Sequence, residues 1–424
     1  MKILKPFYYD DFKCVANKCK DSCCIGWNID IDKKSYNKYK RVKGEFGKKI
    51  QSGICRNRSS TNELKYGNMD IKSNDGVCPF LNEENLCDVY VKLGEEYLCS
   101  TCKVYPRLIE KYGEIYERNL SVSCPVVAEV LVKSSEYLEF LLDEESFNNT
   151  DKEYVNNNQS YNMKLYDILW KSRSLSIEIA QYRPIKLWKR LMLIILTEEK
   201  IQHLINSSSY ENINDVIFML KQTMSDSKIS DTLDNISTVP KVKILYTNII
   251  LDMDMAKNHL NNTFVGFIND FNEFIVNETN MANSSNNVNK DVQFLKQVAG
   301  CEKEFNEYLE NKEYILENYV VYNLYGNYMK SLYTKDLHKE IVRLVLSYSI
   351  INKMLFGRWI KNNKKLKDED FVDAIYSFSR NLEHNEQFIN KIYNNIKNAG
   401  YDSMAYLAML IRWWFFLRIK RREI

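Results

Sequence analysis

The sequence is poor in histidine, glycine and proline. Its 424 residues include four histidines, and all of them lie far downstream of the N-terminal cysteines: His203, His259, His338 and His384. A zinc site that combines neighbouring cysteine and histidine ligands is therefore not indicated. Thirteen glycines and six prolines leave long stretches without a residue that interrupts a helix. This composition favours helices over turns.

The sequence also lacks an excess of charge of one sign and a leader-like apolar run. Its 59 basic and 56 acidic residues are interspersed and give a formal charge of +3. The concentrated basic surface of nucleic-acid-binding proteins is not predicted, apart from a short basic cluster at the C-terminal end. Lys5 and Pro6 interrupt the first apolar residues, so no secretory signal is recognised. We expect a cytoplasmic protein with no nucleic-acid partner.

The cysteines that are present are concentrated at one end of the chain. Cys301 stands alone in the last 300 residues, and the other ten cysteines precede residue 125: Cys14, Cys19, Cys23, Cys24, Cys55, Cys78, Cys87, Cys99, Cys102 and Cys124. Such a bias predicts a thiolate metal site. A disulfide framework is the competing hypothesis, but it requires an oxidising compartment and normally a secretory signal.

The spacing of the cysteines leaves the type of metal open. Cys99-x2-Cys102 suits a zinc knuckle and an iron–sulfur cluster equally well. Adjacent residues of an extended chain point to opposite sides, so we expect one of Cys23 and Cys24 to face another metal or the core. The C-x3-C-x2-C pattern of radical S-adenosylmethionine enzymes fails, because Gly26 occupies its last position. A G-x-G-x-x-G dinucleotide-binding loop is absent too.

Glycine and proline also indicate the organisation of the chain. Eight of 13 glycines and four of six prolines precede residue 126. We predict a mainly α protein in which a loop-rich, cysteine-dense module at 1–142, ending in an exit helix over 127–142, precedes an all-helical region at 163–424. A polar linker at 143–162 separates them, and a polar loop near 277–291 interrupts the helical region. Apolar spacing predicts helices at 163–181, 185–206, 241–260, 303–331, 336–361, 369–381, 386–399 and 401–421.

Several short motifs in the first 125 residues resemble the flagellin lysine-N-methylase family. They are Cys19-Lys-Asp-Ser-Cys23-Cys24-Ile-Gly-Trp27, Cys78-Pro-Phe-Leu81, Leu86-Cys87-Asp-Val-Tyr90, Tyr105-Pro106-Arg107 and Ser123-Cys124-Pro125. The cysteines alone are also similar to a wider group of zinc- or iron-chelating CxxCxxxCC domains. The resemblance implies methyl transfer from S-adenosyl-L-methionine to surface lysines of flagellin in the cytoplasm. It also implies an iron–sulfur cluster, of the 4Fe-4S type, with zinc as the alternative.

The resemblance further implies which cysteines bind the metal. The positions that match the family's cysteine-bearing segments are Cys19, Cys23, Cys24, Cys78, Cys87, Cys102 and Cys124. Cys14, Cys55 and Cys99 match less securely. The residues themselves suggest two cofactor-binding side chains. Trp27 follows the double cysteine and either lines a pocket or shields the metal, and Arg107 either holds the donor's carboxylate or forms a structural ion pair.

Other features have two interpretations. Tyr319, Tyr322, Tyr325 and Tyr328 recur every third residue, and core packing is favoured over an aromatic cage for a cation. The C-terminal segment around 401–421 is either the last helix of the core or a peripheral helix at an anionic membrane surface. No catalytic base is assigned. Methyl transfer itself proceeds either by direct displacement or through electron transfer from the cluster.

Two further functions compete with the methyltransferase hypothesis. A zinc-stabilised protein-interaction module would use the thiolates only to fold. An iron or redox protein would hold a cluster without binding the methyl donor. Binding of S-adenosylmethionine separates the methyltransferase from both.

Overall fold

The computed structural model describes residues 1–145, 161–234, 261–284, 290–383, 386–398, 400 and 402–411. Most of these residues are helical, which confirms the prediction of a mainly α protein. The helices are α1 (Lys33–Tyr39), α2 (Gly44–Ser52), α3 (Asp88–Leu93), α4 (Ser100–Val104), α5 (Pro125–Lys133), α7 (Met163–Ala180), α8 (Leu187–Ser207), α9 (Ile213–Ser225), α10 (Ser227–Asp234), α12 (Asn262–Ser284), α13 (Lys290–Leu309), α14 (Glu313–Asn327), α15 (Ser331–Thr334), α16 (Leu337–Lys361), α17 (Asp368–Phe378), α18 (Glu386–Asn398) and α19 (Met404–Ile411).

Two small sheets accompany the helices. The strands are β1 (Lys2–Pro6), β2 (Asp30–Ile31), β3 (Ile54–Arg56), β4 (Gly67–Met69), β5 (Arg107–Tyr112), β6 (Ile115–Leu120) and β7 (Phe140–Glu144). One sheet has the order β5-β6-β1-β7, with β1 parallel to β6 and antiparallel to β7. The other has the order β2-β4-β3 and lies within the cysteine-rich part. Few strands were expected from the sequence, because β1 pairs with β6 and β7, which lie more than 100 residues later in the chain.

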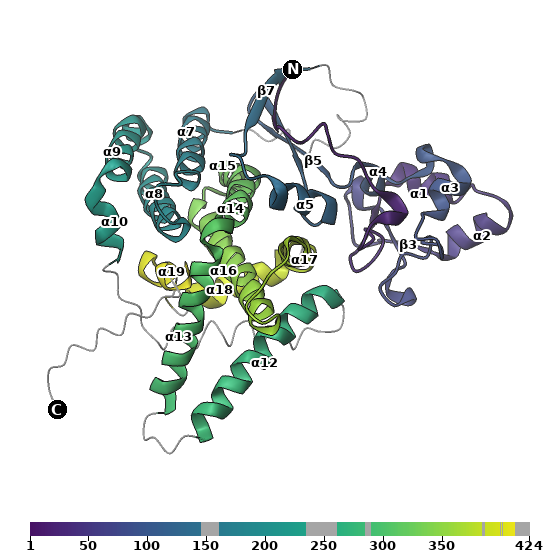
Figure 1. The fold of residues 1–424 in the computed structure, drawn as a ribbon. Coiled ribbons are helices and arrows are strands. Elements are labelled where there is room, and N and C mark those ends of the chain that lie inside the picture. The colour runs from purple at the N-terminus through teal and green to yellow at the C-terminus, as the bar shows by residue number, and fades with distance from the viewer. Residues whose placement is uncertain are drawn as a thin grey trace.

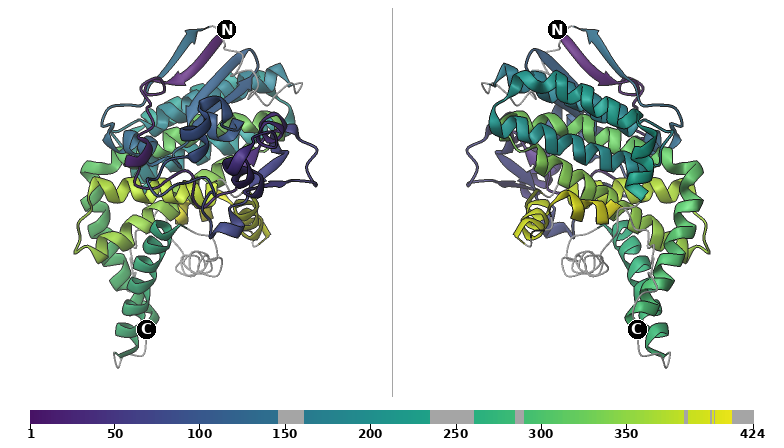
Figure 2. Two further views of the ribbon diagram at one scale, coloured as in Figure 1. Left: turned by 90° about the vertical axis from the view of Figure 1, so that its right-hand side faces the viewer. Right: turned by 90° about the vertical axis from the view of Figure 1, so that its left-hand side faces the viewer.

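The described residues form two hydrophobic cores, and Figure 1 shows the corresponding two parts of the molecule. The large core belongs to the helical body and also takes in residues of the four-stranded sheet. In Figure 2, α7 and α8 lie side by side as one layer, which packs on α14 and α16. The small core is built between residues 29 and 102, and five of the eleven cysteines belong to it or pack against it. It lies beside the helical body (Figure 1).

Most predicted helices are present with ends close to those expected. α7 starts after Asn162, whose side-chain oxygen accepts hydrogen bonds from the amides of Lys164 (2.9 Å) and Leu165 (3.2 Å). α16 starts after Asp336, whose carboxylate accepts from the amide of Lys339 (2.9 Å). Such caps satisfy amides that have no partner within the helix. The predicted helix over 241–260 and most of the predicted C-terminal helix lie outside the described residues.

Two sequence predictions need correction. The helix predicted over 127–142 is wrong in its second half, because α5 ends at Lys133 and β7 begins at Phe140, where it pairs with β1. The helix predicted over 303–331 is divided near residue 310 into α13 and α14. In addition, α9, α10 and α12 were not expected, and α12 continues to Ser284 within the segment predicted as a polar loop.

The tyrosine repeat confirms the expectation of core packing. Tyr319, Tyr322, Tyr325 and Tyr328 are all buried along α14 and the turn that follows it. The hydroxyl of Tyr325 donates to the carbonyl oxygens of Leu4 (2.8 Å) and Arg118 (3.1 Å), so α14 is tied to the four-stranded sheet. No described helix combines the length and apolar composition needed to cross a bilayer.

Close packing of α12 against α16 gives a first testable prediction. A Cβ atom on Gly357 would lie 2.6 Å from the backbone nitrogen of Phe271 and 2.7 Å from its Cα. Because backbone cannot move aside cheaply, Gly357→Ala is expected to lower the free energy of unfolding by about 3 kcal/mol. Gly300→Ala is the matched control, since nothing lies within 4 Å of its added Cβ. That variant should gain about 0.5–1 kcal/mol from helix propensity, and urea denaturation of both variants checks the pair.

Candidate metal centre and the adjoining groove

Five cysteines gather in the small core. Cys78 and Cys99 are buried members of this core, and Cys24, Cys87 and Cys102 pack against it. They come from four separate segments of the chain. We call these five residues the thiol group.

The positions of Cys24 and Cys78 follow from two turns that face each other. Gly26 and Gly76 both have positive φ angles, of 84° and 82°, which glycine adopts without strain. The amide of Gly26 donates to the carbonyl of Gly76 (2.9 Å), and the amide of Cys78 donates to the carbonyl of Cys24 (2.7 Å). These hydrogen bonds place the two cysteines next to each other across the turns.

The other three cysteines lie at or near helix starts. Cys87 precedes α3, Cys99 precedes α4, and Cys102 lies within α4. The carboxylate of Asp32 fixes α4 against α1, because it accepts from the amide (2.9 Å) and hydroxyl (2.7 Å) of Ser100 as well as from the amide of Ser35 (2.8 Å). The helix starts therefore present their cysteines from a rigid frame.

Backbone amides point to several of the sulfurs. The pKa of Cys87 is raised by burial, although the amides of Tyr90 and Val89 donate to its sulfur and oppose this rise. The pKa values of Cys78 and Cys99 are lowered mainly by the neighbouring thiols of Cys24 and Cys102. The amides of Phe80 and Cys102 lower them further. Amide donors of this kind favour the thiolate form, which is the form that binds metals.

The sulfurs also interact with each other in pairs. A contact with Cys24 lowers the pKa of Cys78. The pKa of Cys24 is raised to about 12, because Cys78 and burial outweigh the lowering effect of Cys23. A contact with Cys99 raises the pKa of Cys102, and burial together with Cys24 and Cys78 raises it further. Crowded, buried thiols are hard to ionise together without a cation among them.

The chemistry of this donor set suits zinc or an iron–sulfur cluster, since both bind four thiolates. Within the described part of the chain, however, no three histidine, cysteine or acidic side chains meet as a ready metal site. The thiols approach each other pairwise instead. All eleven cysteines are free thiols, so no disulfide competes for the thiol group.

Three other predicted ligands lie where the cysteine-rich part meets the helical body. The Cys19 sulfur donates to the carbonyl of Asp21 (3.1 Å), and Cys124 directly precedes α5. Burial raises the pKa of Cys124 to about 11, and nearby Cys19 and Cys23 add to this effect. Cys23 also contacts Cys24, which is the main cause of its raised pKa. Cys23 therefore connects this set to the thiol group.

Arg380 holds the loop of these cysteines against the helical body. It belongs to a π-helical turn, η9 (Ser379–Glu383), directly after α17. Its guanidinium forms an ion pair with the Asp21 carboxylate (2.8 Å) and donates to the carbonyls of Ser22 (3.2 Å) and Ser123 (3.0 Å). The Arg380 side chain is 3% exposed. One side chain thus joins η9 to the start of α5 and to the loop at residues 19–24, which we call the double-cysteine loop.

The remaining cysteines are placed apart from the thiol group. Cys14 and Cys55 are exposed, and Cys301 lies half-buried in α13 of the helical body. Sequence matching favoured Cys102 over Cys99, but the structure brings both into the thiol group. The C-x2-C spacing of Cys99 and Cys102 at the start of a helix is the sequence signal that could have placed Cys99 among the predicted metal ligands.

The two predicted cofactor-binding side chains have separate surroundings. The indole nitrogen of Trp27 donates to the carbonyl of Cys23 (2.5 Å), and its ring lies 5.5 Å from that of Tyr105. Trp27 therefore packs beside the loop that carries Cys23 and Cys24. Arg107 starts β5 and holds its guanidinium over the Phe12 ring (5.3 Å). No carboxylate of the described residues forms an ion pair with Arg107.

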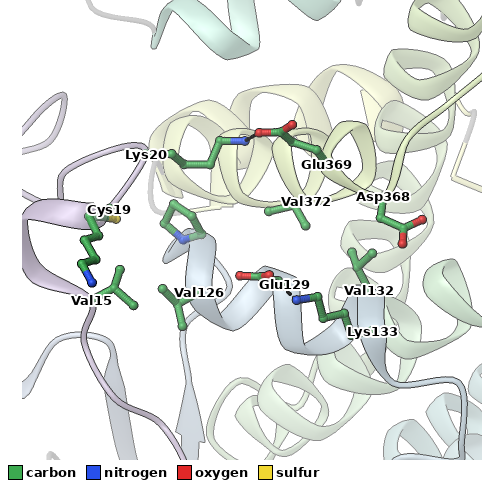
Figure 3. A pocket seen from close by; sticks show the side chains of 12 residues that line it. Val15, Cys19, Lys20, Val126, Glu129, Val132, Lys133, Asp368, Glu369 and Val372 are labelled. Atoms are coloured by element: carbon green, nitrogen blue, oxygen red, sulfur yellow. Dashed lines mark hydrogen bonds and ion pairs between the residues drawn. The ribbon is translucent and has the colours of Figure 1, made fainter.

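A groove of about 330 Å³ adjoins Cys19. Figure 3 shows it between α5, α17 and the loop that carries Cys19. Apolar side chains, including Val126, Val132 and Val372, form its walls. Charged side chains of both signs surround them, and some are paired with each other: Lys20 with Glu369 (2.9 Å) and Lys133 with Glu129 (2.5 Å). The groove can therefore accept an elongated ligand with an apolar stem and a charged end.

Comparison with known proteins identifies the class of protein. The FliB lysine N-methylase C-terminal domain family matches residues 173–410, more than half of the chain. The chain belongs to this family, which confirms the resemblance noted in the sequence.

Relatives extend the similarity to nearly the whole chain. The chain is 23% identical over 402 residues to the Lysine-N-methylase of Salmonella typhimurium, an alignment that covers 94% of this chain and 96% of the relative. It is 22% identical, with the same coverage, to the Lysine-N-methylase of Salmonella choleraesuis. A 126-residue alignment, 30% of this chain and 73% of the relative, is 33% identical to the Flagellar biosynthetic protein FliU of Salmonella muenchen. No solved structure matches the chain.

Proposed function

We propose that this protein methylates lysine side chains of flagellin in the cytoplasm and takes the methyl group from S-adenosyl-L-methionine. Family membership gives the enzyme class, a protein-lysine N-methyltransferase. The flagellar name of one relative supports a flagellar substrate.

We further propose that the thiol group provides the ligands of an iron–sulfur cluster. The observation that supports this is the gathering of Cys24, Cys78, Cys87, Cys99 and Cys102 in one small core, with amides donating to several sulfurs. Five candidates are available for the four thiolates that such a cluster needs. A bound cluster supplies either electron transfer or a structural cross-link.

The groove beside Cys19 suits the side chain of a substrate lysine. Its valine walls can pack against the lysine methylenes, and the carboxylates of Glu129 and Glu369 at its rim attract the ammonium group. The ammonium group must lose a proton to solvent before its amine can accept a methyl group. Positioning the amine in line with the donor's methyl group supplies much of the rate enhancement in such a transfer. The rim carboxylates Glu129 and Glu369 already pair with Lys133 and Lys20. The ammonium group of the substrate would therefore replace one of these lysines as the partner of a carboxylate.

Metal analysis combined with a methyl-transfer assay tests the proposal. Protein purified without oxygen is expected to contain iron and matching acid-labile sulfide, with a brown absorption band that bleaches in air. It should transfer labelled methyl groups from S-adenosylmethionine to purified flagellin. Flagellin with chemically acetylated lysines is the matched control and should take up no label, since its amines are blocked.

The competing functions give different results in the same experiment. Stoichiometric zinc without sulfide, and no transfer of label, would indicate a zinc-stabilised interaction module. Iron and sulfide without any binding of the methyl donor would indicate a redox or iron protein. Either result would reject the proposed activity.

A further inference from the structure

The small positive charge of the whole chain conceals a local excess. Residues 28–72 contain twelve lysines and arginines but only five aspartates and glutamates, a formal charge of +7. Since the complete chain carries +3, all other residues together carry −4. The positive charge is thus concentrated in the cysteine-rich part, on α1, α2 and the adjoining strands.

The structure fixes part of this charge in a rigid turn between α1 and α2. The side-chain amide of Gln51 donates to the carbonyls of Lys40 and Val42 (both 3.3 Å), and so holds the turn against α2. Gly47 allows this approach, because a Cβ there would lie 2.2 Å from the Val42 carbonyl oxygen. The cations on this turn are therefore presented by a fixed backbone.

Four exposed cations on this turn and on α2 have no acidic partner among the described residues. Other basic residues nearby are neutralised within the chain, such as Lys33 by Glu63 (2.5 Å) and Lys49 by Asp88 (2.8 Å). By contrast, no ion pair with a described carboxylate involves Lys40, Arg41, Lys43 or Lys48, all of which are exposed. We call these four residues the basic face.

We propose that the basic face binds an acidic segment of the protein substrate that flanks the lysine to be methylated. The inference rests on the proposed function for its choice of a protein as the partner. Fixed, unpaired cations attract and orient an acidic partner before it docks. α2 has nine residues and is about 14 Å long. It can face about four residues of an extended peptide. Lysines with acidic neighbours should therefore be preferred substrates.

The size of the face favours a peptide over nucleic acid. Nucleic-acid-binding proteins commonly neutralise six to ten phosphates, roughly twice what four cations offer. A membrane surface would require apolar or aromatic side chains that enter the lipid interface. The basic face presents none, since its four residues are all lysine or arginine.

A binding experiment without methyl donor tests the proposal. The probe is a fluorescein-labelled 12-residue peptide with one lysine between two runs of glutamate, and the comparison peptide has glutamine in their place. At low salt the glutamate peptide is expected to bind roughly tenfold more tightly. The triple substitution Lys40→Glu, Arg41→Glu and Lys43→Glu should abolish this difference.

A matched variant keeps the result specific to the face. Lys164→Glu, Lys200→Glu and Lys228→Glu make the same change of charge at exposed lysines of the helical body that have no ion pair with a described residue. This variant should retain the preference for glutamate. Thermal melts of both variants verify that they fold.

Two results would overturn the proposal. One is equal binding of the two peptides by the wild-type protein, and the other is a preference that survives the triple substitution. Binding of a 12-nucleotide DNA or of phosphatidylglycerol vesicles through these lysines, without the preference for glutamate, would assign the face to another partner. If the protein prefers the glutamate peptide but transfers no methyl group, the proposed activity is disproved, whereas binding of acidic peptides by the basic face is supported.

Discussion

The Cys102→Ser protein is expected to purify with little iron and sulfide and to unfold at a lower temperature than the wild type. Cys102 belongs to the thiol group, where it contacts Cys99 and interacts with Cys24 and Cys78. Serine is a much poorer ligand for soft metals. The metal-binding free energy of a cysteine site contributes directly to folding, by about 10 kcal/mol in small zinc domains. Losing one ligand should therefore weaken the whole small core.

The Cys55→Ser protein is the matched control for this experiment. Cys55 lies in the same part of the chain, on β3, but its side chain is exposed and outside the thiol group. Its substitution should leave metal content and stability within error of the wild type. Metal analysis and differential scanning calorimetry, both without oxygen, compare the two variants. Full iron and sulfide in Cys102→Ser would remove Cys102 from the ligands, and equal losses in both variants would show that metal content does not depend on the thiol group in particular.

The helical fold could be predicted because its signals are local. The predicted helix at 336–361 differs from α16 by one residue at its start, since Asp336 caps it and apolar residues recur at helical spacing. Strands β1 and β7 carry no comparable local signal. β1 pairs with β6, more than 100 residues later, and the same pairing region converts the end of a predicted helix into β7. In β1 and β7, pairing with distant strands determined the secondary structure, whereas the local propensity of the residues did not.

The candidate site shows a similar division. Cysteine content and position located the part of the chain that holds the thiol group, because cysteine is chemically distinctive and rare elsewhere. The role of Arg380 had no such signal, since one arginine of a helical sequence resembles every other. Nor did the chain-wide charge reveal the basic face, because acidic residues elsewhere cancel most of its charge. Both features become apparent only when the partners of each side chain are known.

Arg380→Ala is expected to lower the free energy of unfolding by about 3–5 kcal/mol, the usual range for removing one partner of a buried ion pair. The alanine leaves the Asp21 carboxylate, which is 11% exposed, without its guanidinium. It also leaves the carbonyl of Ser123 without its guanidinium donor and the carbonyl of Ser22 with the amide of Ile25 alone. Because these groups belong to the double-cysteine loop and the start of α5, we expect that loop to open first. Urea denaturation measures the loss, and limited proteolysis locates the cut near residues 19–24.

A double-mutant cycle with Asp21→Ala separates the ion pair from the other contacts of Arg380. If the pair dominates, the two single changes and the double change should cost similar amounts, and the coupling energy should exceed 1 kcal/mol. Arg58→Ala is the control, since Arg58 is exposed and has no ion pair with a described residue; its cost should stay below about 0.5 kcal/mol. A cost below 1 kcal/mol for Arg380→Ala would show that the loop is held by other contacts.

A loss of metal in Arg380→Ala at a temperature where the helical body is still folded would show, in addition, that the helical body positions the cysteines. The two parts of the molecule would then form one functional unit, because a residue of η9 would control ligands that lie some 360 residues earlier.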